Sequence, residues 1–179
     1  MKFPKPIKSA IFDSGPLLLA LSLNYINKNY IQNDDEFLKL AYGKPAKIPT
    51  LKLTLEKFFN KFNKIYTTPH VIGELKGLVK SRLKLKDNEY KFWIQSIDYL
   101  KRKNLSEKLL TLVELSDDSN YKNLIPSIGF VDTELIKLAF ELKPRLTIIS
   151  IDGRTLKREA NKKTIDVFIL EDDIYSFIN

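Results

Sequence analysis

Short apolar segments rich in β-branched residues alternate along this chain with longer segments of helical periodicity, and this alternation constrains the fold most strongly. Strands are predicted at residues 7–12, 65–66, 146–151 and 167–170. Between them, apolar side chains recur at the spacing of a buried helix face. Strands that alternate with helices form parallel sheets, because each helix carries the chain back to the edge where the next strand begins. The sequence therefore predicts an α/β fold built on a parallel sheet.

The length of 179 residues favours a single domain over residues 1–179, and 44% hydrophobic side chains suffice for one substantial core. We find no internal repeat, low-complexity tract or interdomain linker. Residues 24–49 are mostly polar, although Phe37, Leu38 and Ala41 fit a short helix. We interpret this segment as an elaboration outside the core.

Two proline residues mark predicted helix starts. Pro16 suits the first position of a helix, because its missing N–H has no partner there. In the same way, Thr68 and Pro69 are predicted as the N-cap and first residue of a second helix. The apolar stripe of that helix consists of Val71, Leu75, Leu78 and Val79. Glu74 lies at the edge of this stripe, so its carboxylate can reach over the rim of the core.

The C-terminal half of the chain contains further predicted helices at residues 88–100, 105–115 and 127–142. The polar cluster at residues 116–120 is predicted to be a loop. Asp132 falls in or just before the first turn of the last helix. The β-branched strand that comes after this helix ends at Asp152.

The composition excludes several kinds of catalytic and metal site. Cysteine is absent, so the chain has neither disulfides nor thiolate ligands, which is compatible with a reducing cytoplasm. His70 is the only histidine, so a serine hydrolase triad, a two-histidine metal site and a cysteine–histidine pair each lack a required residue. We expect His70 to be a surface or packing residue at the start of its helix.

Basic residues outnumber acidic ones by 30 to 22, which gives a formal net charge of +8. Such an excess attracts polyanions and favours nucleic acid as a partner, although a lysine-rich composition also arises from solubility or genomic base composition. No apolar run reaches the roughly 18 residues of a membrane span. No signal-peptide cleavage site follows the apolar stretch near the N-terminus. We therefore expect a cytoplasmic protein without a membrane partner.

Four carboxylates occupy positions that a parallel sheet brings to one edge. Asp13 and Asp152 end predicted strands, and open parallel sheets bind ligands beyond the carboxyl ends of their strands. Glu74 and Asp132 lie near the starts of helices that return toward the same edge. A carboxylate cluster either raises the pKa values of its members or holds a cation, and oxygen ligands favour Mg²⁺ or Mn²⁺. Each residue taken alone also has an ordinary explanation as a turn residue, a helix cap or a surface charge.

The segments around these four residues carry a family resemblance. Residues 11–15, 68–75, 129–135 and 148–152 resemble, in order, the four acidic motifs of PIN-domain nucleases. The resemblance implies a three-layer α/β/α fold with a central, mainly parallel sheet, and hydrolysis of RNA phosphodiester bonds with a divalent metal. It carries the catalytic and metal-binding roles to Asp13, Glu74, Asp132 and Asp152. Hydroxyl residues of the first and fourth motifs are matched by Ser14 and Ser150, which would orient carboxylates or water.

The chain departs from the family pattern in two places. Asp13 and Glu74 are 61 positions apart, a longer step than small toxin-type members show, so residues 24–60 are interpreted as an insertion. Gly153 follows Asp152 where an additional acidic or polar residue is frequent in the family. The resemblance therefore leaves open whether one metal ion or two would bind.

The resemblance predicts a metal-dependent endoribonuclease of the toxin type or the RNA-processing type. It implies single-stranded or structured RNA as the partner, and it allows an antitoxin or other protein inhibitor and a homodimer. The alternative is a catalytically silent PIN-like scaffold that binds RNA or a protein through its basic faces. An aspartyl phosphatase is disfavoured because Gly15 stands where that chemistry needs an acid. A nucleotide-binding fold is disfavoured because no phosphate-binding glycine loop occurs.

Two basic runs follow Glu74 and Asp152 and would flank the acidic edge. From these runs, the predicted RNA-binding residues are Lys80, Arg82, Lys84, Arg154 and Arg158. The alternative is an ordinary solvated helix face, since a run of charges usually indicates only exposure.

Overall fold

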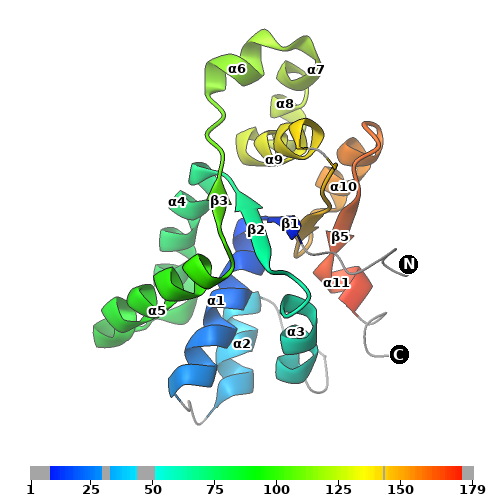
Figure 1. Ribbon diagram of the computed structural model, residues 1–179. Helices are drawn as coiled ribbons and strands as arrows, with labels where there is room; N and C mark the ends of the chain where they lie inside the picture. The colour runs from blue at the N-terminus through cyan, green and yellow to red at the C-terminus, as the bar shows by residue number, and fades with distance from the viewer. Residues whose placement is uncertain (1–8, 30–32, 44–50, 143, 175–179) are drawn as a thin grey trace.

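The chain folds around a five-stranded sheet in which neighbouring strands are parallel (Figure 1). The computed structural model describes residues 9–29, 33–43, 51–142 and 144–174. The strands are β1 (Ser9–Phe12), β2 (Lys64–Thr67), β3 (Ser106–Glu107), β4 (Ile148–Ser150) and β5 (Val167–Ile169). Their order is β3-β2-β1-β4-β5, which places β1 at the centre. The predicted α/β class with a parallel sheet is confirmed, while residues 7–8 of the first predicted strand lie outside the described residues.

Helices fill the connections between the strands. They are α1 (Ser14–Asn29), α2 (Asp34–Tyr42), α3 (Leu51–Phe59), α4 (Pro69–Leu78), α5 (Glu89–Arg102), α6 (Leu112–Asp117), α7 (Ser119–Lys122), α8 (Ile125–Ile128), α9 (Phe130–Glu141), α10 (Arg154–Asn161) and α11 (Leu170–Asp173). A π-helical turn η1 (Val79–Leu83) continues α4, and a 3₁₀ turn η2 (Lys86–Asn88) precedes α5.

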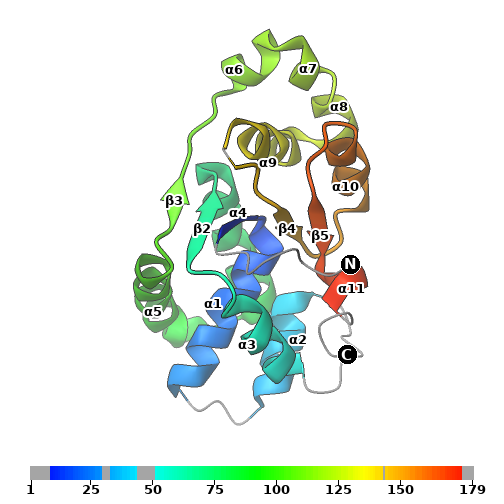
Figure 2. The same ribbon diagram turned by 45° about the vertical axis from the view of Figure 1, so that its right-hand side comes forward.

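The helices gather in two groups. Helix α1 contacts α2, α3, α4 and α5, whereas α9 and α10 contact each other and pack against β4 and β5. Both views show α6, α7 and α8 at one end of the molecule and α1, α2 and α3 at the other (Figures 1 and 2). This arrangement is compatible with three layers. Among the described helices, none has the length and apolar character needed to span a membrane.

The centre of the hydrophobic core consists of β1 and α1. Ala10, Ile11 and Phe12 are fully buried, as expected for a central parallel strand that is covered on both faces. Helix α1 buries its leucine-rich run, residues 17–21, on every side, which is typical of a helix surrounded by other elements. The helix begins at Ser14, two positions before the predicted start at Pro16, and Leu17 N–H donates to the Asp13 carbonyl at 3.1 Å.

The expectation that residues 24–49 lie outside the core is wrong. Tyr25, Ile26, Leu38 and Ala41 are buried in the same hydrophobic cluster as β1. Helix α2, which fits the short helix predicted there, packs against both α1 and α3. A short helix needs only a few apolar side chains on one face to pack into a core, so the polar composition of residues 24–49 was misleading. Parts of this segment, residues 30–32 and 44–50, lie outside the described residues.

The predicted helix at residues 105–115 is also wrong. Ser106 and Glu107 form the edge strand β3, which pairs with Tyr66 and Thr67 of β2. Two residues are too few to show a strand periodicity in the sequence. Helix α6 starts only after Thr111, whose side chain and that of Glu114 form a reciprocal capping box.

The loop predicted at residues 116–120 contains the junction of two short helices, α6 and α7. At this junction, the Asp118 carboxylate accepts a hydrogen bond from Asn120 N–H at 2.9 Å and so caps α7. The helix predicted at residues 127–142 is likewise divided into α8 and α9. Gly129, with φ of 86°, separates them because this positive φ favours glycine. The break places Asp132 in the first turn of α9.

Candidate active site

Asp13 immediately follows β1 at the carboxyl edge of the sheet, where its backbone N–H donates to Ile149 of β4 at 3.1 Å. Both carboxylate oxygens accept hydrogen bonds. Oδ1 accepts from Ser14 N–H at 2.6 Å and from Ser14 Oγ at 3.3 Å, and Oδ2 accepts from Ser150 Oγ at 2.9 Å. Burial raises the pKa of Asp13, the bonds from Ser150 and Ser14 oppose this, and the charge of Asp152 raises it further. The two hydroxyl residues predicted beside the acidic motifs therefore both contact Asp13.

Asp132 has a strongly raised pKa. It is partly buried in the first turn of α9, and its pKa is raised to about 7, with burial as the largest cause. The negative charges of Asp13, Glu74 and Asp152 contribute to the same rise, in that order of effect. All four predicted carboxylates therefore lie close enough to interact electrostatically at one edge of the sheet.

Glu74 lies on α4, close enough to Asp13 for their charges to interact. The residue is exposed as a whole, but desolvation of its carboxyl raises its pKa, and the charge of Asp13 adds to this. The Ser14 hydroxyl and His70 act in the opposite direction and lower it. Thr68 and Pro69 start α4 as predicted, since the Thr68 hydroxyl accepts from Val71 N–H at 3.5 Å. The cap at Thr68 fixes the direction in which α4 presents Glu74.

Asp152 is exposed in the turn between β4 and α10. Its carbonyl accepts a hydrogen bond from Arg154 N–H at 2.6 Å, which closes the turn. Gly153 is needed there, because a Cβ at this position would lie 2.9 Å from Ser150 Oγ. The hydroxyl that holds Asp13 thus occupies the space that any larger residue after Asp152 would need.

The donor chemistry of this edge fits a hard divalent cation, because its ligands are carboxylate oxygens whose charges repel one another. As the side chains stand, however, no three acidic or histidine residues of the described chain converge closely enough to hold an ion together. Glu74 and Asp152 are exposed and belong to a helix surface and a turn. Asp13 is the carboxylate already fixed in place.

A buried glutamate beside the four carboxylates was missed as a structural element by the sequence analysis. The Glu134 side chain has no exposed surface; it accepts from Thr68 Oγ at 3.1 Å, and its Oε1 lies 2.9 Å from His70 Nδ1. The His70 ring meets Phe130 edge-on, with ring centroids 4.9 Å apart. These contacts tie the start of α4 to the N-terminal half of α9. A signal was present: Glu134 is a carboxylate directly before the apolar pair Leu135 and Ile136 on a buried helix face.

His70 is thus a packing residue with a specific polar partner, in agreement with its expected structural role. Burial raises the pKa of Glu134, while His70 and the Thr68 hydroxyl lower it and the charge of Glu74 raises it. The contact with His70 therefore offsets part of the cost of placing another acidic group near the cluster.

Three of the predicted RNA-binding residues are engaged by the protein itself. Arg82 Nη1 donates to the carbonyls of Ala41 and Tyr42 at 3.1 and 3.4 Å and so caps the end of α2. Arg154 pairs with Asp172 at 2.9 Å and lies 3.5 Å from Glu171, and Arg158 pairs with Glu159 at 3.0 Å. Lys80 and Lys84 are exposed and form no ion pair within the described residues. Of the five predicted RNA-binding residues, these two are left without an ion pair or a side-chain hydrogen bond in the described part of the chain.

Comparison with known proteins yields no matching family model, and neither curated proteins nor solved structures give a significant match. The class of protein is therefore defined by its own fold and site. It is a parallel α/β protein with a cluster of interacting carboxylates at the carboxyl edge of the sheet.

Proposed function

We propose that this chain is a divalent-metal-dependent endoribonuclease with a PIN-like fold. The observation that supports it is the mutual interaction of Asp13, Glu74, Asp132 and Asp152 at the ligand-binding edge of a parallel sheet. Charges of one sign at this spacing destabilise the folded state unless protons or a cation neutralise them. Perturbed carboxylates of this kind are common at functional sites.

Asp13 and Asp152 are the proposed direct ligands of Mg²⁺ or Mn²⁺, with Glu74 and Asp132 holding the ion directly or through water. When bound, such an ion lowers the pKa of a water molecule, polarises a phosphoryl oxygen and offsets charge in the transition state of hydrolysis. Ser14 and Ser150 fix both oxygens of Asp13, so this carboxylate needs little rearrangement to act as a ligand. The Glu134–His70–Thr68 contacts hold the two helices that carry Asp132 and Glu74.

RNA is the proposed substrate because the net charge of +8 favours binding of a polyanion. The carboxylates at the edge of the sheet repel phosphate groups, so cations near this edge are needed to bind an RNA backbone there. Lys80 and Lys84 are the proposed backbone contacts. An antitoxin or other protein inhibitor, a homodimer, and the choice between a toxin-type and an RNA-processing role remain proposals from the sequence resemblance. The same is true of a cytoplasmic location.

A catalytically silent PIN-like scaffold that binds RNA or protein is the second candidate. One observation favours it: in the described chain, no three side chains already hold the geometry of a metal site. Such a scaffold would bind RNA in chelator as well as in Mn²⁺ and would cleave it in neither.

Cleavage of a mixed-sequence RNA should be followed in EDTA and in rising Mn²⁺ or Mg²⁺. We expect chelation to abolish cleavage, either ion to restore it, and Asp13→Asn to lower it by at least about a hundredfold, as for loss of a charged group that acts in the transition state. Asp98→Asn is the matched control, because it removes the same charge from an exposed position on α5. Cleavage that survives chelation, or that is lost equally in both variants, would reject the proposal.

A further inference from the structure

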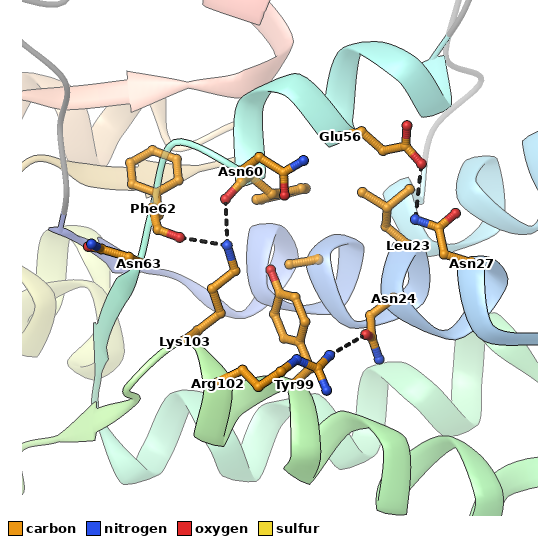
Figure 3. A pocket seen from close by; sticks show the side chains of 12 residues that line it. Leu23, Asn24, Asn27, Glu56, Asn60, Phe62, Asn63, Tyr99, Arg102 and Lys103 are labelled. Atoms are coloured by element: carbon orange, nitrogen blue, oxygen red, sulfur yellow. Dashed lines mark hydrogen bonds between the residues drawn. The ribbon is translucent and has the colours of Figure 1, made fainter.

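A polar cavity lies beside α1, between the end of α3 and the end of α5 (Figure 3). Its volume is about 540 Å³, within the range of pockets that hold small organic ligands. It is bounded by α1, by the end of α3 and residues 60–63 that lead into β2, and by the end of α5 that leads into β3. Because the strands are parallel, elements that lead into β2 and β3 lie at the edge opposite Asp13.

The cavity combines an apolar floor with a polar rim. Leu23, Phe59 and Phe62 form the floor and are buried. The rim carries the side chains of Asn24, Asn27, Asn60, Asn63, Glu56, Tyr99, Arg102 and Lys103. An apolar base with several converging polar groups is the usual composition of a ligand site.

Some rim groups are already satisfied by the fold. Lys103 donates to the carbonyls of Phe59 and Phe62 at 3.0 and 2.6 Å, and so caps the end of α3. Asn27 donates to Glu56, the carboxylate of the rim, at 3.0 Å. This carboxylate pairs with an amide and leaves the two neighbouring cations, Arg102 and Lys103, without an ion pair within the described residues.

Other rim groups have hydrogen-bonding capacity that the described chain does not use. The hydroxyl of Tyr99 points toward the middle of the cavity, and neither it nor the side-chain amides of Asn60 and Asn63 has a hydrogen-bond partner in the described part of the protein (Figure 3). Burial raises the pKa of Tyr99, so its hydroxyl stays protonated and can donate at neutral pH. Arg102 uses Nη2 to donate to Asn24 at 2.9 Å, and its guanidinium has further donors.

We infer that this cavity binds a nucleoside monophosphate, with the phosphate at Arg102 and the sugar and base over the apolar floor. A guanidinium presents paired donors that match a phosphate, and the positive excess of Arg102 and Lys103 over Glu56 favours a dianion. The amides of Asn60 and Asn63 and the Tyr99 hydroxyl supply both donors and acceptors for the edge of a base. The same chemistry is found in a free nucleotide and in the phosphorylated end of an RNA chain.

The test measures binding of AMP, CMP, GMP and UMP to the full chain by calorimetry in EDTA, so that the bare carboxylate edge repels phosphate. Adenosine, ribose 5-phosphate and inorganic phosphate are the comparison ligands. We expect at least one nucleotide to bind saturably and about tenfold more tightly than each comparison ligand. An oligonucleotide with a 5′-phosphate is then compared with the free nucleotide, and the tighter ligand of the two identifies the source.

Two variants connect this binding to the cavity. Arg102→Ala should weaken nucleotide binding by about tenfold to a hundredfold, as expected for loss of a charged hydrogen bond, and Tyr99→Phe by about threefold to tenfold. Lys101→Ala is the matched control, because it removes the same charge at the preceding position, which does not line the cavity. If Arg102→Ala lowers the folded fraction, the Tyr99→Phe comparison decides alone.

The inference is overturned if no nucleotide binds at millimolar concentration, if inorganic phosphate binds as tightly as the nucleotides, or if Arg102→Ala and Tyr99→Phe bind like the wild type. Asp13→Asn should bind nucleotide unchanged in EDTA. Loss of the proposed nuclease activity therefore leaves this result unaffected, and the two proposals fail independently.

Discussion

Replacing Asp132 by asparagine should stabilise the metal-free protein, and the gain should grow with pH. The pKa of Asp132 rises from 3.8 to about 7 in the folded state, so the folded protein keeps this proton to a higher pH than the unfolded chain does. Ionisation of Asp132 between these values therefore lowers the free energy of unfolding as pH increases, and the loss is complete above pH 7. A shift of this size corresponds to at most about 4 kcal/mol, because one pKa unit is worth about 1.4 kcal/mol.

Interactions among neighbouring carboxylates and small movements of the side chains reduce this value, so we expect a stabilisation of about 2–4 kcal/mol at pH 8. Between pH 5 and pH 8 the difference between Asp132→Asn and the wild type should grow by about 1.5–3 kcal/mol. Urea unfolding in EDTA at both pH values measures it, with Asp98→Asn as the exposed control. If Asp132→Asn is destabilised equally at both pH values, the folded state does not disfavour ionisation of Asp132.

Three further predictions concern the surroundings of the cluster. Ser150→Ala should raise the pKa of Asp13 further, because it removes the stronger of the two hydroxyl contacts, and should weaken Mn²⁺ binding by about tenfold, as measured by calorimetry. His70→Ala should lower the free energy of unfolding by about 1–3 kcal/mol, because it leaves the buried Glu134 carboxylate without one of its partners. Adding Glu134→Leu should recover part of this loss. A double variant that is no more stable than His70→Ala would contradict the role of the pair. The double variant Lys80→Ala, Lys84→Ala should weaken RNA binding and reduce the slope of log affinity against log salt by about 0.7 per lost contact. Arg82→Ala should mainly lower the free energy of unfolding, by about 1 kcal/mol, because it uncaps α2. Equal salt slopes in the wild type and the lysine double variant would show that RNA binds elsewhere on the protein.

The parallel sheet and the positions of the acidic residues were predictable because each depends on local patterns. Ile11 and Phe12 belong to an apolar β-branched segment, and Asp13 marks its end. This is enough to predict that Asp13 lies at the ligand-binding edge, because parallel sheets bind ligands beyond the carboxyl ends of their strands. Thr68 and Pro69 defined the start of α4 because capping involves only neighbouring residues. The sequence therefore indicated which carboxylates reach the edge of the sheet.

The errors occurred where distant contacts decide the structure. Ser106 becomes part of a strand only because β2 offers it a free edge, and no local pattern records that edge. Leu38 is buried because α1 and α3 cover it, although residues 33–36 just before it are all polar. The structural role of Arg82 was not foreseen for the same reason: its RNA contact stays a prediction from a basic run, and its guanidinium caps a helix 40 positions earlier in the chain.

The arrangement of α4 and α9 explains how a repulsive edge can persist in a folded protein. Glu74 of α4 and Asp132 of α9 repel each other. The contacts of Glu134 with His70 and Thr68 lie beside this pair and join the same helices through a buried acceptor and two donors. A buried group with these partners resists separation because exposing one partner alone leaves the other unsatisfied. The contacts of Glu134 therefore hold α4 and α9 together despite the repulsion between Glu74 and Asp132. Binding of a cation or a proton would relieve this repulsion without separating the two helices.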